Sequence, residues 1–530
     1  MVAIRKASGG VRGLVVGDFL RRLVARSLAQ HYATDFEAAC HPHQYALSTR
    51  AGTEALFHTL QLTTETDHRQ TVLSVDGIGA YDHVSRNAML RGLANTPHAQ
   101  AALPFARLFY SQPSTYLWTD DHGQTHPITQ AEGGEQGDPL MPALFSLALD
   151  FALRAFQADL LPGERVMAFL DDIYITAPPP RIRPLFDSLS THLLQHTHIQ
   201  LHHGKTQIWN ASGEEPANIR SLGQDASNPV WVGDTALPSN KRGLRVLGLP
   251  LGTPTYVQTE LNNMRAAHQP LLNALTTLPD LQTSWLLLLY CASPRAHYAL
   301  RGIRPDLTGT YATAHDAAVI ACLAQLLDHQ HGALPEHASH RAHLALDQGG
   351  LGLRSAHHHT AAAYWASWHY VAPIIQRKSP NLFTHITEQL TTAVDSATPS
   401  IQCLQHVQEF LRNLGLEAPA WAECAPPGPP TQAELPQQLR GWQQAASTVI
   451  DQAYANFVEA SADPAGQALL ESQRGPHASR TFTLLPTSPE LTFEPAHFRV
   501  LLLRFADPTV PLPEQPSGLP AEAKPEHTQS

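Results

Sequence analysis

Between residues 166 and 180, two short apolar runs flank a polar turn. Val166–Leu170 and Ile173–Ile175 are rich in β-branched and aromatic residues, which favour buried strands, and three prolines end the pattern. The runs therefore predict a hairpin with the adjacent carboxylates Asp171 and Asp172 at its tip. Neighbouring carboxylates repel each other, so this pair indicates either a solvated turn or a cation site.

A third carboxylate follows another apolar run. Residues 72–75 are typical of a buried strand, and Asp76 comes next, ahead of two glycines and a helical pattern. Further along, a glycine-rich loop at 132–137 precedes a predicted helix with one apolar face. That face is formed by Leu140, Ala143, Leu144, Leu147 and Phe151. The pattern thus predicts two strand ends with carboxylates, separated along the chain by a loop and a buried helix.

After the hairpin, strands give way to helices. Lys205 lies in a loop within residues 199–210, residues 244–252 predict a further strand and turn, and residues 257–301 are leucine-rich with helical spacing. The apolar run at 285–290 is too short to cross a bilayer. With 530 residues, of which 43% are hydrophobic, the chain can bury a large core and should divide into several subdomains.

Three short motifs occur in sequence within this pattern. They are Asp-x-x-x-Ala-Tyr-Asp at 76–82, Gln-Gly-Asp-Pro-Leu at 136–140 and Phe-Leu-Asp-Asp at 169–172. In this order and at these separations they resemble the palm of a reverse transcriptase, most closely the type found in non-LTR retrotransposons and group II introns. The resemblance covers about residues 3–255. It implies an α+β fold, namely a right-hand polymerase with fingers, an antiparallel-sheet palm and a helical thumb, followed by a helical extension and a disordered tail.

The resemblance and the composition together divide the chain. A linker is predicted where proline is dense, and disorder where proline, glutamate and serine dominate the C-terminal end. The expected parts are fingers at 1–70, which we expect to be incomplete, a palm at 71–255, a helical thumb at 256–335, a helical extension of unknown role at 336–423, a linker at 424–438, a helical C-terminal segment at 439–506 and a disordered tail at 507–530.

The resemblance implies a catalytic set made of Asp76, Asp171, Asp172 and Lys205. Asp76 and Asp171 would be metal ligands with Asp172 in support. The implied cofactor is a pair of Mg²⁺ ions, for which Mn²⁺ can substitute. Hard cations prefer carboxylate oxygens, and two such ions can hold the attacking and leaving oxygens of a phosphoryl transfer. Lys205 is either the acid that protonates the leaving pyrophosphate or an ordinary surface lysine.

Nucleotide and template binding is implied for a second set: Tyr81, Gln136, Gly137, Arg12 and Lys6. The Tyr81 ring would pack under the sugar and exclude a 2′-hydroxyl, although a core aromatic also fits this position. Arg12 is followed by glycine where relatives usually have proline, which weakens its assignment to the triphosphate.

Only the N-terminal segment of the chain has the positive charge expected of a protein that binds a polyanion. The chain carries a net charge of −11, whereas residues 1–50 contain seven basic and three acidic residues. A basic patch, and not the net charge, attracts nucleic acid. Arg21, Arg22 and Arg26 in this segment equally fit a solvated helix face.

The implied function is RNA-directed DNA polymerisation in a retrotransposon, with an RNA template, a DNA or RNA primer and dNTPs as partners and with no membrane. Five dispersed cysteines and the lack of a signal pattern predict an intracellular protein of the nucleus or cytoplasm that is not secreted. Three alternatives stay open. These are an RNA-dependent RNA polymerase, a catalytically inactive or fragmentary RNA-binding relative, and a maturase-like splicing cofactor.

Overall fold

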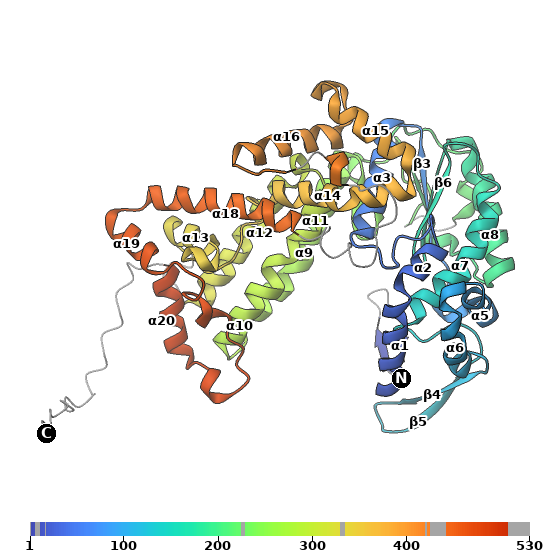
Figure 1. Ribbon diagram of the computed structural model, residues 1–530, viewed down its shortest axis with the longest axis horizontal. Coiled ribbons are helices and arrows are strands. Elements are labelled where there is room, and N and C mark those ends of the chain that lie inside the picture. Colours follow the sequence, from blue (N-terminus) through green and yellow to red (C-terminus); the bar gives the residue numbers. More distant parts are fainter. Residues whose placement is uncertain are drawn as a thin grey trace, which may run out of the picture. The chain divides into compact units, whose positions relative to one another are not determined.

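A computed structural model describes residues 2–5, 11–15, 17–223, 228–328, 334–418, 421–424 and 441–506 (Figure 1). The chain divides into two compact units. Unit 1 combines Met1–Arg265, His297–Tyr311 and His359–Val449, and unit 2 combines Ala266–Ala296, Ala312–His358 and Ile450–Ser530. Both units are therefore built from stretches that are far apart in the sequence.

The centre of unit 1 is a four-stranded antiparallel sheet in the order β6-β7-β3-β8. The two predicted apolar runs of the hairpin form β6 and β7, and the run before Asp76 forms β3, so these strand predictions are confirmed. The bounds are Thr71–Val75 for β3, Arg165–Phe169 for β6, Asp172–Ala177 for β7 and Gln207–Trp209 for β8. The antiparallel sheet with flanking helices confirms the α+β class.

One face of this sheet is apolar and packs against helices. Leu73, Val166, Ile175 and Ile208 form one cross-strand row, and all four are buried together with residues of α5, α7 and α8. Figure 1 shows α7 and α8 on one side of β3 and β6, with α3 on the other. Burying each such side chain contributes about 1.5–3 kcal/mol, so this layer fixes the strands that carry the carboxylates.

The opposite face of the sheet meets α3, which contacts both β3 and β6. Because side chains alternate along a strand, Arg165 and Met167 point away from Val166 and the apolar layer. Helix α14 packs on α3, with the His58 ring stacked on Trp368 at 4.3 Å between centroids. Residues 359–449 therefore pack as part of the same unit as the sheet.

Three two-stranded hairpins complete the strands of unit 1 within the described residues, each with antiparallel pairing. The predicted strand and turn at 244–252 form the last of them. The remaining elements of unit 1 are β1 Val2–Arg5, β2 Val11–Leu14, α1 Phe19–His31, α2 Ala33–Ala39, α3 Gly52–Thr66, α4 Ala80–His83, α5 Arg86–Ala94, α6 Leu103–Tyr110, β4 Ser114–Thr119, β5 Thr125–Gln130, α7 Met141–Gln157, α8 Ile182–Thr197, β9 Gly243–Val246, β10 Leu249–Gly252, α11 His297–Gly302, α14 Thr360–Lys378, α15 Pro380–Thr391 and α16 Pro399–Asn413.

In its described residues, unit 2 consists of helices joined by turns and irregular segments, and none of these residues lies in a strand. Trp285 is fully buried in its core and donates its indole N–H to the carbonyl of Phe482 at 2.8 Å. Its helices include α10 Leu281–Leu287, α13 Glu336–His343, α19 Pro464–Ser472 and α20 Pro495–Ala506, while α9 Pro254–Leu275, α12 Pro305–Leu326 and α18 Trp442–Ser461 each run across a unit boundary. The helical pattern predicted for 257–301 is confirmed.

Some expectations fall on other parts of the chain. Apart from Cys424, the linker predicted at 424–438 lies outside the described residues, as does the whole tail predicted at 507–530. All five cysteines lie among the described residues, and none of them forms a disulfide bond. No helix among the described residues combines the length and apolarity needed to span a membrane.

Candidate active site

Three carboxylates lie where β3 and β7 meet. Val75 pairs with Ile173 in the antiparallel register, so the next position on β3, Asp76, lies opposite Asp172, the first residue of β7. Asp171 occupies the two-residue turn between β6 and β7. The local pattern of apolar strands followed by acidic residues thus brings the three predicted carboxylates to one edge of the sheet.

Lys205 reaches this cluster from the short helical turn before β8. The chain after β3 pairs with residues near 201, because the His202 N–H donates to the Asp76 carbonyl at 2.7 Å. This pairing places the Lys205 ammonium 2.5 Å from Asp76 Oδ2. The lysine side chain is 57% exposed, so the ion pair contributes at most about 1 kcal/mol. Its main effect is to bring a mobile proton donor next to the carboxylates.

The cluster carries more negative charge than Lys205 offsets. Desolvation and the charges of Asp171 and Asp76 raise the pKa of Asp172 to about 6, while Lys205 acts in the opposite direction. Excess carboxylate charge on oxygen donors fits a hard divalent cation. In the described part of the chain, no three His, Cys, Asp or Glu side chains form a ready-made metal site. Mg²⁺ typically takes one or two carboxylates and completes its shell with water and substrate phosphates, so the donor set fits.

The turn that carries Asp171 is held in an unusual backbone conformation. Leu170 has φ of 55°, in the left-handed region that disfavours a bulky residue by about 1–2 kcal/mol. The Leu170 N–H donates to Oε1 of buried Gln44 at 2.8 Å, and the chain on either side of Gln44 pairs with Ala168 of β6. Gln44 therefore fixes the turn, and strain of this kind often accompanies functional sites.

Tyr81 lies beside the carboxylates and also belongs to the core. Its ring stacks on Phe145 of α7, with centroids 4.5 Å apart and planes 5° from parallel. Burial, together with the charge of Asp171, raises the pKa of the Tyr81 hydroxyl. The structure thus places a rigid, half-buried ring next to Asp171, as either a sugar-selecting or a core role requires.

The predicted Gln-Gly loop folds against the segment that carries Tyr81. The Gly134 N–H donates to the Tyr81 carbonyl at 2.8 Å, and Gln136 Nε2 donates to Asp82 Oδ1 at 3.4 Å. Gly133 has φ of 70°, and a Cβ there would lie 2.2 Å from the Asp82 carbonyl oxygen. Glycine is therefore required at this position by close backbone approach. Gln136 and Gly137 are half-buried beside this contact.

A buried charge network behind the loop was missed at the sequence level. Arg21 of α1 forms an ion pair with Glu135 at 2.8 Å and lies 3.5 Å from Asp138, and its side chain is only 16% exposed. Tyr110 donates to Asp138 at 2.6 Å, and Tyr116 donates to Glu135 at 3.3 Å. The Arg21 guanidinium also lies over the Phe109 ring at 3.9 Å. The network joins α1 to both ends of the Gln-Gly pair.

For Arg21, the expectation of a solvated helix face is wrong. Arg22 and Arg26 on the same helix are exposed, so the expectation is confirmed for these two residues. The only local signal for the network was an acidic residue next to Gln136, and nothing near it in sequence points to Arg21. Arg12 lies in β2, opposite Ile4, without a described side chain, and Lys6 lies outside the described residues.

Comparison with known proteins gives similarities of different extent. Residues 4–251 match the family model described as reverse transcriptase (RNA-dependent DNA polymerase). The chain is 29% identical over 177 residues to the retrovirus-related Pol polyprotein from type-1 retrotransposable element R2 of Popillia japonica, which covers 31% of this chain and 24% of that protein. The chain therefore matches about a quarter of the length of this relative.

Two telomerase structures are also similar. The apo telomerase from Candida tropicalis is 10% identical with a TM-score of 0.34, covering 72% of this chain and 60% of that one. The telomerase from Candida albicans in complex with a fragment of telomeric RNA is 12% identical with a TM-score of 0.31, covering 71% and 57%. Both similarities are weak.

Proposed function

We propose that this chain, of which residues 4–251 match the reverse transcriptase family model, is an RNA-directed DNA polymerase of a retrotransposon that adds dNTPs to a primer 3′-hydroxyl by two-metal catalysis. The observation that carries this proposal is the convergence of Asp76, Asp171 and Asp172 at one sheet edge with an excess of negative charge. The proposed partners are an RNA template, a DNA or RNA primer and dNTPs.

The carboxylates of Asp76 and Asp171 would hold Mg²⁺, with Asp172 in support. When bound, such ions supply charge stabilisation for the attacking and leaving oxygens of the phosphoryl transfer. The protein's own contribution is positional. The strand register fixes Asp76 opposite Asp172, and Gln44 holds the turn that orients Asp171.

Two further side chains have proposed roles in this reaction. The Lys205 ammonium carries a proton on Nζ next to Asp76, from where it could pass to the leaving pyrophosphate, a type of acid catalysis that contributes about 10²–10⁴-fold. The Tyr81 ring, held flat against Phe145, would exclude a 2′-hydroxyl and so favour dNTPs. Gln136 and Gly137 would contact the template and incoming nucleotide.

Primer extension tests the proposal directly. Purified protein is incubated with poly(rA)–oligo(dT), dTTP and Mg²⁺, and we expect products that lengthen with time and disappear when EDTA is added. Parallel reactions that replace dTTP with UTP, or poly(rA) with poly(dA), measure the sugar and template preferences separately. Absence of extension on every template, by protein with a cooperative melting transition, would contradict the enzymatic proposal and favour an inactive RNA-binding relative. Preferential incorporation of UTP on RNA would favour an RNA-dependent RNA polymerase.

A further inference from the structure

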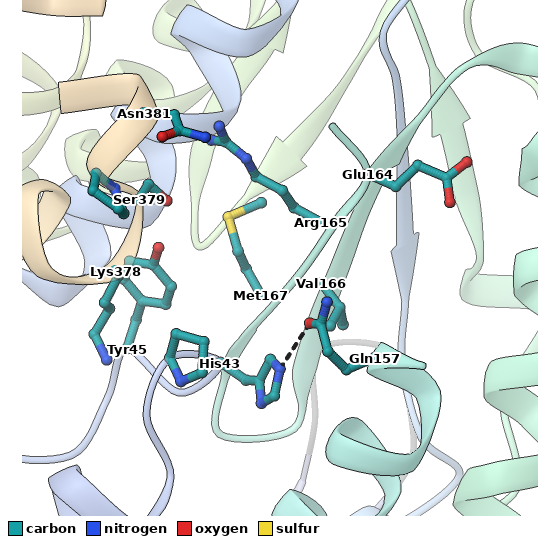
Figure 2. Close-up of a pocket in the computed structure, with 12 residues that line it drawn as sticks. His43, Tyr45, Gln157, Glu164, Arg165, Val166, Met167, Lys378, Ser379 and Asn381 are labelled. Carbon is teal, nitrogen blue, oxygen red and sulfur yellow. Dashed lines mark hydrogen bonds between the residues drawn. The ribbon is translucent and has the colours of Figure 1, made fainter. Parts of the chain in front are cut away.

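A polar cavity lies within unit 1, at the other end of β6 from the Asp171 turn. It has a volume of about 270 Å³, and its walls come from the chain before α3, the start of β6, the end of α7 and the junction between α14 and α15. Its polar lining residues include His43, Tyr45, Gln157, Arg165, Lys378, Ser379 and Asn381 (Figure 2).

Arg165 is the side chain in this cavity whose charge is not matched. Figure 2 shows it extending from β6 toward Asn381 at the start of α15. Its Nη1 atom is buried and has no hydrogen-bond partner, and burial lowers the pKa of its guanidinium. Burying a cation without an anion is costly, which points to an anion that completes the site.

The carboxylate in the cavity wall does not fill that role. Glu164 is held in a two-pronged ion pair by Arg181, with contacts of 2.7 and 3.1 Å. Lys378 adds a second cation, whose side chain is fully buried and whose ammonium donates to the Gln44 carbonyl at 2.8 Å and lies 3.3 Å from Glu37. The lining therefore has an excess of positive charge.

The start of α15 adds backbone donors to the same cavity. Ser379 precedes the helix without capping it through its side chain, and Pro380 and Asn381 are its first two residues. Pro380 has no N–H, so the first backbone donor of α15 is the N–H of Asn381. The first N–H groups of a helix have no intrahelical acceptor and carry a partial positive charge, so they favour anions. A helix N-terminus next to an arginine fork is a combination that suits phosphate oxygens.

From this cavity, the unmatched Arg165 and the uncapped helix start, we infer that unit 1 binds the phosphate group of a small phosphorylated molecule between β6 and α15. Arg165 binds the phosphate oxygens through its guanidinium, and the N–H groups of α15 complete the contact. This site is separate from the proposed polymerase site, because it uses none of the three carboxylates. The phosphate site and the proposed polymerase activity can therefore be tested independently of each other.

Calorimetric titration tests this inference. Full-length protein is titrated in EDTA, which prevents metal-dependent phosphate binding at the carboxylates, with inorganic phosphate, with AMP and with adenosine at constant ionic strength. We expect saturable 1:1 binding of inorganic phosphate, AMP or both, and none of adenosine. AMP binding more tightly than phosphate identifies a phosphorylated metabolite, and the reverse order identifies free phosphate. No saturable binding of either, or equal binding of adenosine and AMP, would overturn the inference.

Two matched pairs of variants locate the site. Arg165→Gln should weaken phosphate binding by at least about tenfold, because it removes charge-assisted hydrogen bonds to the phosphate, whereas Arg107→Gln at an exposed position of α6 should not. Asn381→Asp adds a charge that favours the helix start but repels phosphate, and Asn381→Ser is its neutral control. Because Asn381 is exposed, both variants should fold. Parent-like binding by both Arg165→Gln and Asn381→Asp would place the phosphate elsewhere.

Discussion

At one end of β6, the turn after Phe169 gathers carboxylates, and burial together with the charges of Asp171 and Asp76 raises the pKa of Asp172 to about 6. At the other end of the same strand, Arg165 carries a buried guanidinium nitrogen without a partner. The two ends have opposite charge excesses, and each is best matched by a partner from solution. The Arg21 network differs from both, because Glu135 and Asp138 already surround its cation. The Arg165 nitrogen without a partner points to a ligand, whereas the Arg21 network, in which each charged group has a partner, points to structural support.

The largest expected effect concerns the carboxylate end. Asp76→Asn or Asp171→Asn removes a proposed metal ligand, so we expect primer extension to fall by at least about a thousandfold, or about 4 kcal/mol of transition-state stabilisation. The melting temperature should change little, because the substitution also removes like-charge repulsion. Asp395→Asn, at an exposed position, is the control and should retain the parent rate. Extension at near-parent rates by both variants would remove the two-metal assignment.

The Arg21 network should respond mainly in stability. Arg21→Met leaves Glu135 and Asp138 buried without their cation, and we expect a loss of about 2–3 kcal/mol, reduced from the fully buried case because Arg21 is partly exposed. Arg22→Met, one position further on an exposed face, should change stability by less than about 0.5 kcal/mol. Urea denaturation of the three proteins provides the comparison.

A second replacement sharpens this result. The Arg21→Met variant would lose stability because Glu135 stays buried without its cation. In that case the Arg21→Met, Glu135→Met double variant should recover part of the stability, because an apolar pair can replace a buried ion pair at little cost. A double variant that is less stable than Arg21→Met alone would show that Glu135 acts through Tyr116 or other partners instead.

Within the cavity, two cations should behave differently. Lys378→Met leaves the Gln44 carbonyl and Glu37 without their donor and should cost about 2 kcal/mol. Arg165→Met removes a cation that has no anion and should be neutral or slightly stabilising in phosphate-free buffer. Thermal denaturation of both variants measures the contrast. Equal destabilisation by the two substitutions would mean that Arg165 has a structural partner.

The smallest expected effect separates sugar selection from packing at Tyr81. Tyr81→Val should raise the ratio of rNTP to dNTP incorporation by at least about tenfold, which is about 1.4 kcal/mol. Tyr81→Phe keeps the ring against Phe145 and should resemble the parent. Single-nucleotide incorporation on one primer-template measures the ratio. A folded Tyr81→Val protein with both sugars slowed equally would favour the core role.

The strands and the positions of the carboxylates could be predicted because their signals are local. An apolar run of strand length is readable in a few residues, and Asp76, Asp171 and Asp172 directly flank such runs. The supports of the site could not be predicted in this way. Gln44 reaches Leu170 across 126 positions, and Arg21 reaches Glu135 across 114. Such contacts depend on tertiary packing, which leaves no periodic trace in the sequence.

The cavity could be predicted from the sequence even less than the supports of the carboxylate site. Arg165 is an unremarkable basic residue at a strand start, and α15 resembles any amphipathic helix until the two are brought together. Only the packed structure reveals that the guanidinium lacks a partner. An arginine indicates a ligand site only if it is buried without a partner. Whether it is buried depends on neighbours that are distant in the sequence.

Helix α14 packs on α3 but is synthesised much later, which affects folding during synthesis. His58 of α3 is buried against Trp368 and bonds Ser367 at 3.0 Å, yet about 300 residues separate α3 from the end of α14. At about 5–20 residues per second, a ribosome needs roughly 15–60 s to synthesise that interval. Throughout this time the face of α3 that packs on α14 is uncovered, so the nascent chain offers chaperones an apolar binding site. A shortened chain that stops at the end of the family match would keep that face uncovered.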